Sequence, residues 1–200
     1  MPALQREIVS TSDFADLVRR AQQGDELAFN ALFRENQPVV LKYLAAITGM
    51  AAAEDIASET WVSVVRDLKR FSGEEPAAFR AWVLSIARRR WIDDLRRRSR
   101  RPEILVDSTP DMTASADDVE SLAERATGTR WAMELLATLP PDQAEVLALR
   151  VIADLDVHTT AQLVGKTSGA VRVLAHRALR RLAEQIGPDV TNPDSPANES

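Results

Sequence analysis

The sequence predicts an all-α protein made of two small helical domains joined by a flexible acidic linker. Apolar residues recur at the three- and four-residue spacing of amphipathic helices through both halves of the chain. Between these halves, residues 102–116 contain two Pro, several Ser and Thr, and no Lys or Arg, which is typical of a linker. A chain of 200 residues is long enough to give each half its own core.

These patterns divide the chain into five segments. They are a flexible N-terminal arm (1–12), a first helical domain (13–101), the linker (102–116), a second helical domain (117–186) and a disordered tail (187–200).

Charge and composition narrow the classes of function. The net charge of −5 argues against a protein that coats nucleic acid indiscriminately, yet Arg is concentrated at 88–101 and 172–181. The chain has no Cys, which excludes a disulfide framework and a cysteine-based zinc site. It shows neither a signal peptide nor an apolar stretch long enough to cross a bilayer. We therefore expect a cytoplasmic protein without membrane insertion.

The first two helices of the first domain follow from their boundary residues. Thr11 or Ser12 can cap a helix over 13–23. Asp25 begins a second helix, whose apolar stripe is expected to start at Leu27 and in which we expect Pro38 to produce a kink or an interruption.

A third helix is predicted over 51–71. Its apolar side chains are expected to point inward: Ile56, Val62, Val65 and Leu68. Its first half carries acidic side chains: Glu54, Asp55 and Glu59. Acids near a helix N-terminus are also stabilised by the helix dipole, so they do not by themselves indicate a binding site.

The fourth helix, over 79–101, combines an apolar first half with a basic second half. Its apolar residues, Trp82 among them, predict burial of one face, whereas Arg residues dominate from Arg88 onward. Arg pairs with phosphate oxygens through two parallel hydrogen bonds, and Trp91 could either stack on an unpaired base or be part of the core. The alternative is a solvated helix end whose cations complement the helix dipole.

In the second domain, helices are predicted over 116–138, with Trp131 in the core, and over 143–153. A helix-turn-helix pattern follows, with a short helix over 157–164 capped by Asp156, a turn at Gly165 and a longer helix over 168–186. The longer helix has an apolar back and a basic front, as a helix that enters the major groove of DNA requires. An ordinary helical hairpin is the alternative.

No catalytic arrangement is evident in the sequence. Adjacent acids lie on helices or in the linker, where neighbouring side chains diverge. The two histidines, His158 and His176, lack the spacing of metal ligands, and no Gly-rich phosphate loop occurs. We therefore expect no enzyme activity, cofactor, metal or small-molecule substrate.

Four blocks in their order resemble the group IV, or extracytoplasmic-function (ECF), sigma factors of bacterial RNA polymerase. The blocks are GDELAFNALFRENQPVVLKYL, AEDIASETWVSVVRDLKRF, FRAWVLSIARRRWIDDLRRR and LPPDQAEVLALRV…TAQLVGKTSGAVRVLAHRALRRL. The resemblance implies that the first domain binds core polymerase and reads and melts the −10 promoter element. It implies that the second domain recognises the −35 element through its helix-turn-helix.

The resemblance also implies three sets of contact residues. Contacts to core polymerase are assigned to Glu54, Asp55, Ser58, Glu59 and Thr60. Contacts to −10 DNA are assigned to Phe71, Ser72, Gly73, Arg80, Arg88, Arg89, Arg90, Trp91, Arg96 and Arg97. Contacts to −35 DNA are assigned to Thr167, Ser168, Gly169, Arg172, Val173, His176, Arg177 and Arg180.

The implied partners are the clamp coiled coil and flap of core RNA polymerase, promoter DNA and an anti-sigma factor, which could hold the protein at the membrane. Departures from the family pattern at Arg89, Trp91, Val173 and Leu174 leave the base contacts open. Two alternatives are a stand-alone helix-turn-helix regulator that acts without polymerase and a helical module that binds an acidic protein.

Overall fold

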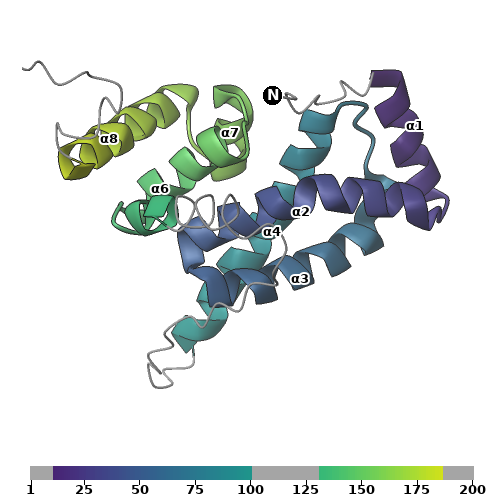
Figure 1. Ribbon diagram of the computed structural model, residues 1–200, viewed down its shortest axis with the longest axis horizontal. Coiled ribbons are helices and arrows are strands. Elements are labelled where there is room, and N and C mark those ends of the chain that lie inside the picture. The colour runs from purple at the N-terminus through teal and green to yellow at the C-terminus, as the bar shows by residue number, and fades with distance from the viewer. Residues whose placement is uncertain (1–10, 101–130, 187–200) are drawn as a thin grey trace, which may run out of the picture.

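The computed structural model describes residues 11–100 and 131–186, and every described element is helical (Figure 1). The first unit, residues 11–100, contains α1 (Thr11–Gln22), α2 (Glu26–Thr48), α3 (Met50–Asp67), the short 3₁₀ helix η1 (Leu68–Arg70) and α4 (Pro76–Arg100). The second unit, residues 131–186, begins with helical residues 131–137. It continues with α6 (Pro141–Leu147), the π-helical turn η2 (Ala148–Ile152), α7 (Val157–Val164) and α8 (Ser168–Ile186). The expected linker and tail lie outside the described residues, as do residues 1–10 of the expected arm, but residues 11 and 12 belong to α1 and not to the arm.

Side-chain caps fix two of the helix starts. The Asp25 carboxylate accepts hydrogen bonds from the backbone N–H groups of Leu27 and Ala28, which begins α2. Asp156 does the same for His158 and Thr159 at the start of α7. The helix starts expected at these two acids are therefore found in the structure.

Of the two outcomes expected at Pro38, the interruption does not occur, because α2 is one helix from Glu26 to Thr48. Proline removes one backbone donor, and the carbonyl left without it is that of Arg34. Arg34 is exposed, so water can bond to that carbonyl and the helix continues.

The inward face of α3 differs from the expected one. Val62 and Val65 are 70% and 58% exposed, whereas Val64 and the polar residues Thr60 and Ser63 are buried. Each hydroxyl donates to a carbonyl one turn earlier, Thr60 to Ile56 at 2.7 Å and Ser63 to Glu59 at 2.9 Å. A hydroxyl bonded in this way can be buried at little cost, so two polar residues occupy core positions that an apolar pattern does not reveal.

Three further expectations on the core are corrected. The helix expected over 143–153 ends at Leu147 and passes into the π-helical turn η2. Trp131 is 48% exposed, and Leu27, which was placed in the apolar stripe of α2, is 77% exposed.

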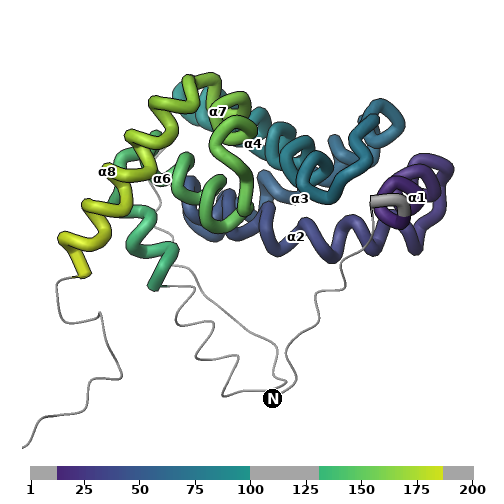
Figure 2. The backbone as a smooth tube through the Cα atoms, turned by 90° about the horizontal axis from the view of Figure 1, so that it is seen from above, coloured from purple at the N-terminus to yellow at the C-terminus, as the bar shows by residue number. Residues whose placement is uncertain are grey.

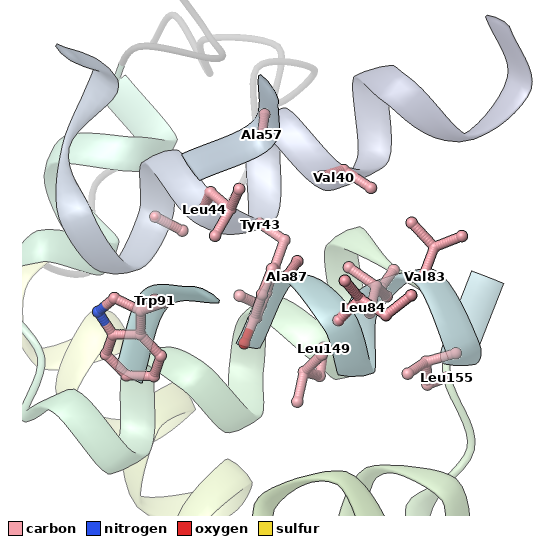
Figure 3. Packing of buried hydrophobic residues seen from close by; sticks show 14 of the residues in the cluster. Val40, Tyr43, Leu44, Ala57, Val83, Leu84, Ala87, Trp91, Leu149 and Leu155 are labelled. Carbon is pink, nitrogen blue, oxygen red and sulfur yellow. The ribbon is translucent and has the colours of Figure 1, made fainter. Parts of the chain in front are cut away.

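The two units pack against each other. α2 contacts α6 and η2, and α4 contacts α7. Figure 2 shows the second unit lying along one end of α2 and α4, with α1 at the opposite end of the molecule. Buried residues of both units therefore form one continuous cluster, in which Tyr43 and Leu149 are fully buried (Figure 3). No pattern in the sequence predicts this contact.

The Asp156 cap predicts a pH-dependent contribution to stability. Hydrogen bonds from the Thr159 hydroxyl and from backbone N–H groups lower the pKa of Asp156 below its ordinary value. The cap therefore stabilises the fold at pH values above the pKa of the unfolded chain, and this contribution disappears as pH falls through the folded-state pKa. Asp156→Ala should reduce the free energy of unfolding by about 1 kcal/mol at neutral pH.

Urea unfolding at several pH values would test this prediction. The difference between wild type and Asp156→Ala should shrink below about pH 4. Asp156→Asn is the matched control, because it keeps an acceptor but cannot titrate. An Asp156→Ala deficit that stayed constant down to pH 2 would contradict the assignment.

Candidate functional site

The helix-turn-helix is built as its sequence predicts. Gly165, at φ +67°, ends α7 in the left-handed conformation, and its N–H bonds back to carbonyls of α7. The Thr167 hydroxyl accepts from the Ala170 N–H at 3.2 Å and caps α8. Val171 and Ala178 are fully buried, which fixes the back of α8 against the rest of the unit.

The front of α8 forms one side of a positively charged groove. This groove has a volume of about 610 Å³, and its lining is Gln143, Arg172, Val173, His176, Arg177, Arg180 and Arg181. The basic side chains are exposed, and Val173 is 49% exposed. Gln143 is buried at the groove, and its Oε1 atom has no hydrogen-bond partner among the described residues. An anionic ligand with an apolar edge, such as a nucleic-acid groove, matches this surface.

More side chains in the basic half of α4 form contacts within the protein than the sequence suggests. Arg90 donates to the Ser63 hydroxyl of α3 at 2.7 Å, and Trp91 is buried, which answers the question that the sequence left open. Arg89, Arg96 and Arg97 are the exposed members of the predicted −10 set on this helix.

Two arginines of the predicted −10 set face the second unit. The Arg88 Nε atom lies 2.5 Å from Oε1 of Glu145 on α6. The Arg80 guanidinium donates to the Ala153 carbonyl at 3.3 Å, and its side chain is 13% exposed.

The loop between η1 and α4 is held by an aromatic cluster. The Phe71 ring lies edge-on to Phe79 at 5.2 Å and tilted against Trp82 at 5.1 Å. The Gln22 side chain of α1 donates to the Phe71 carbonyl at 2.7 Å. Gly73 is packed so tightly that a Cβ atom there would lie 2.5 Å from Cζ of Phe71. This loop is therefore rigid at Phe71, whereas Ser72 is exposed.

The outer face of α3 is exposed and both acidic and apolar. Glu54, Asp55, Ser58 and Glu59 are exposed, as expected of a binding face. Thr60 is fully buried, so its side chain is not part of that face. Val62 and Val65 are exposed on the same helix, and sequence reasoning missed them because they match a core pattern. No local signal in the sequence reveals them, because the burial of Thr60 and Ser63 beside Val64, which turns Val62 and Val65 outward, cannot be predicted from an apolar pattern.

Contacts link the exposed face of α3 to the basic end of α4. Arg97 lies 3.4 Å from Glu59 and 3.6 Å from Asp94. The side chains of Arg97 and Glu59 are 60% and 44% exposed, so this pair contributes little stability and can exchange with other charged groups, whereas the Asp94 side chain is 18% exposed.

No group of three metal-ligating side chains occurs within residues 11–100 and 131–186. In the same ranges no helix has both the length and the apolar character needed to cross a membrane.

Comparison with known proteins identifies both units. Residues 32–101 match the family model of sigma-70 region 2, and residues 129–182 match that of sigma-70 region 4. The ECF RNA polymerase sigma factor ShbA of Streptomyces griseus is 36% identical over 181 residues, which cover 86% of this chain and 94% of ShbA. The ECF sigma factor SigD of Mycobacterium tuberculosis is 32% identical over 175 residues, covering 85% and 82% of the two chains.

Two solved structures share the fold. CnrH, solved in complex with the cytosolic domain of CnrY, has a TM-score of 0.62 at 19% identity and covers 90% of this chain and 99% of its own. The sigma factor RpoE of Bartonella quintana, solved with the anti-sigma factor NepR, has a TM-score of 0.63 at 19% identity. This match covers 80% of this chain and 98% of RpoE.

The chain therefore has the two regions that define a sigma-70 type initiation factor. More specifically, it belongs to the ECF sigma factors, a class of transcription initiation factors rather than catalysts. The presence of both regions favours this identity over a stand-alone helix-turn-helix regulator.

The packing at Gly73 generates a prediction about the loop. Gly73→Ala should reduce the free energy of unfolding by about 1–3 kcal/mol, because the added methyl group displaces the Phe71 ring from its aromatic neighbours. Gly169→Ala is the matched control. Gly169 lies in the first turn of α8 with only the Thr167 hydroxyl near, at 3.9 Å, so the same change should stabilise by up to about 1 kcal/mol. Urea unfolding measures both, and equal effects of the two substitutions would contradict the steric argument.

Proposed function

We propose that the outer face of α3 binds core RNA polymerase. Its exposed residues are Glu54, Asp55, Ser58, Glu59, Val62 and Val65. Acids supply charge complementarity, which steers association, and the two valines supply apolar area at the centre of the contact. The Thr60 side chain does not contact polymerase in this proposal, because it is buried in the core.

We propose that the Phe71–Gly73 loop and the basic half of α4 contact the −10 element, and that α8 contacts the −35 element. The groove of α8 is the observation that supports this proposal. One face of α8 is buried in the protein, and the opposite face exposes basic side chains around Val173. Phosphate contacts by the outer arginines would set the register of the helix on DNA, and the residues from Arg172 to Arg177 would reach base edges. The corresponding domains are residues 13–101 and 117–186.

The remaining assignments follow from the proposed role. The chain would supply promoter specificity in the cytoplasm, where the chromosome lies, while polymerase supplies the catalysis. An anti-sigma factor is a proposed partner, because CnrH and RpoE share this fold and were solved with CnrY and NepR respectively. No cofactor or small-molecule substrate is needed for these steps.

The proposed function predicts promoter melting by the holoenzyme. A holoenzyme assembled from this chain and bacterial core polymerase should bind promoters selected with it. Thymines near the −10 element of these promoters should then become reactive to permanganate. Asp55→Lys should abolish this signal and co-purification with core polymerase, because it places a cation on the acidic face of α3. Asp13→Lys, an equal charge change at an exposed residue of α1, is the control. Normal co-purification of Asp55→Lys would overturn the assignment of this face.

The groove of α8 predicts a separable loss of promoter recognition. Arg172→Ala should weaken transcription from −35-dependent promoters by about 10- to 100-fold, the cost of one good base contact, while polymerase binding stays unchanged. Arg19→Ala is the control, because Arg19 is an exposed arginine of α1 outside the groove. In vitro transcription and co-purification measure the two effects. Wild-type transcription by Arg172→Ala would exclude Arg172 from −35 recognition.

A further inference from the structure

We propose that α1 is part of the −10 binding machinery, with Gln22 and Phe14 as positioning residues. They hold the Phe71–Gly73 loop in the shape that binds the −10 element and do not touch DNA themselves. Helix α1 lies outside residues 32–101, which match sigma-70 region 2, so the family match assigns it no role. This inference rests on the proposed function, because it concerns the loop that is assigned there to −10 DNA.

The loop has no regular structure of its own. Residues 71–75 lie between η1 and α4 and belong to neither helix. The side chains of Ser72, Glu74 and Glu75 are exposed, so they do not anchor the loop in the core. Such a loop keeps one conformation only if groups elsewhere in the protein bind its backbone or bury its side chains, because ordering a free chain costs entropy. The half-buried Phe71 is the residue on which these groups act.

The side-chain amide of Gln22 bonds to both ends of the turn that leads into the loop. Its Nε2 atom donates to the carbonyl of Leu68 at 3.0 Å and to the carbonyl of Phe71 at 2.7 Å. The Phe71 N–H donates to the same Leu68 carbonyl at 3.0 Å. A carboxamide nitrogen has two N–H donors, and both are used here. Gln22 thus ties α1 to two backbone positions that are 46 and 49 residues away in the sequence.

Aromatic rings provide a second link between α1 and the loop. Phe14 is 1% exposed and lies edge-on to Phe79 of α4, with the ring centroids 6.1 Å apart. The Phe79 ring in turn lies edge-on to Phe71 and 5.6 Å from Trp82. Rings packed at such distances and angles attract each other beyond the burial of their area. The Phe71 ring, against which Gly73 packs, therefore depends on α1 for the position of its neighbour.

The turn from α1 into α2 fixes the position of Gln22. Gly24 has φ +95°, which favours glycine, and the Asp25 N–H donates to the Arg20 carbonyl at 3.0 Å. The Asp25 carboxylate, which caps α2, also accepts from Nε of Arg20 at 2.8 Å. Figure 1 shows the chain between η1 and α4 running beside α1. Gln22 is therefore presented to the loop from a fixed support, as a positioning residue requires.

The expected effect on DNA binding follows from the populations of the ordered and disordered loop. One neutral hydrogen bond contributes roughly a factor of five to an equilibrium constant, so two contribute roughly thirtyfold. If the ordered loop is about ten times as populated as the disordered one, loss of both bonds leaves about a quarter of the molecules ordered. The apparent affinity for the −10 strand then falls about fourfold, because only the ordered loop binds.

The electron spin resonance spectrum of a nitroxide on the loop tests the link within the full-length chain. The chain has no Cys, so Ser72→Cys allows labelling at an exposed loop position. Gln22→Met keeps the length of the side chain and removes its donors, and it should raise the mobile component from about a tenth to about three quarters of the signal. Gln23→Met, the same change at the exposed next residue, is the matched control and should leave the spectrum unchanged.

Two further variants complete this measurement. Phe14→Leu, which removes the ring contact to Phe79, should also raise the mobile component. A label at Ala31→Cys, on the exposed side of α2, should keep its spectrum in every variant, because the change is confined to the loop. An unchanged loop spectrum in both Gln22→Met and Phe14→Leu would overturn the inference.

Binding by the holoenzyme tests the consequence for promoter recognition. The two ligands are a fluorescein-labelled single strand carrying the −10 element and a duplex carrying only the −35 element of the same selected promoter. Gln22→Met should weaken binding of the −10 strand about fourfold and leave the −35 duplex unaffected, because α8 lies on the other unit. Gln23→Met should bind both as wild type does. Equal losses on the two ligands, or no loss on the −10 strand, would overturn the inference.

The proposed function fails in a different way. It would be excluded if the wild-type holoenzyme melted no promoter and did not bind the −10 strand. If wild type binds this strand and Gln22→Met binds it equally well, the proposed function stands and only the role of α1 is excluded.

Discussion

The arrangement of the molecule depends on the burial of Glu145 between Arg88 and Tyr43. A carboxylate that is 6% exposed needs charge-assisted partners, and both of its partners lie on the other unit. Loss of either partner would leave this carboxylate buried with less compensation, which is strongly unfavourable. The contact between the two units therefore combines one buried ion pair with the apolar packing of α6 and η2 on α2.

The same contact connects the fold to its function. A sigma factor that reads two promoter elements needs two separate DNA-binding surfaces, and the groove of α8 is exposed in the structure. The proposed −10 surface on α4 is divided, with Arg89, Arg96 and Arg97 exposed and Arg80 and Arg88 facing the second unit.

The outer face of α3 shows how polar residues in a core can turn apolar side chains outward. Thr60 and Ser63 are buried because their hydroxyls bond to carbonyls of the preceding turn, and Val62 and Val65 are consequently turned outward. The resulting combination of acids and valines differs from an ordinary solvated helix face, which rarely exposes neighbouring apolar side chains. Neighbouring exposed valines flanked by charged side chains fit the apolar centre and polar rim of a protein interface, in agreement with the proposed polymerase contact.

The sequence by itself determined the helices, their caps and the helix-turn-helix, because these depend on residues within one or two turns of each other. Asp25, Asp156 and Gly165 act on their immediate neighbours, and the bounds of α7 and α8 agree with the pattern of their residues. The family also followed from local blocks in their order. Only the tertiary structure decided whether Arg88, Arg90 and Trp91 are exposed or form contacts within the protein, since their partners are distant in the sequence. Glu145 is 57 residues from Arg88 and 102 from Tyr43, and no local periodicity encodes a contact between groups so far apart.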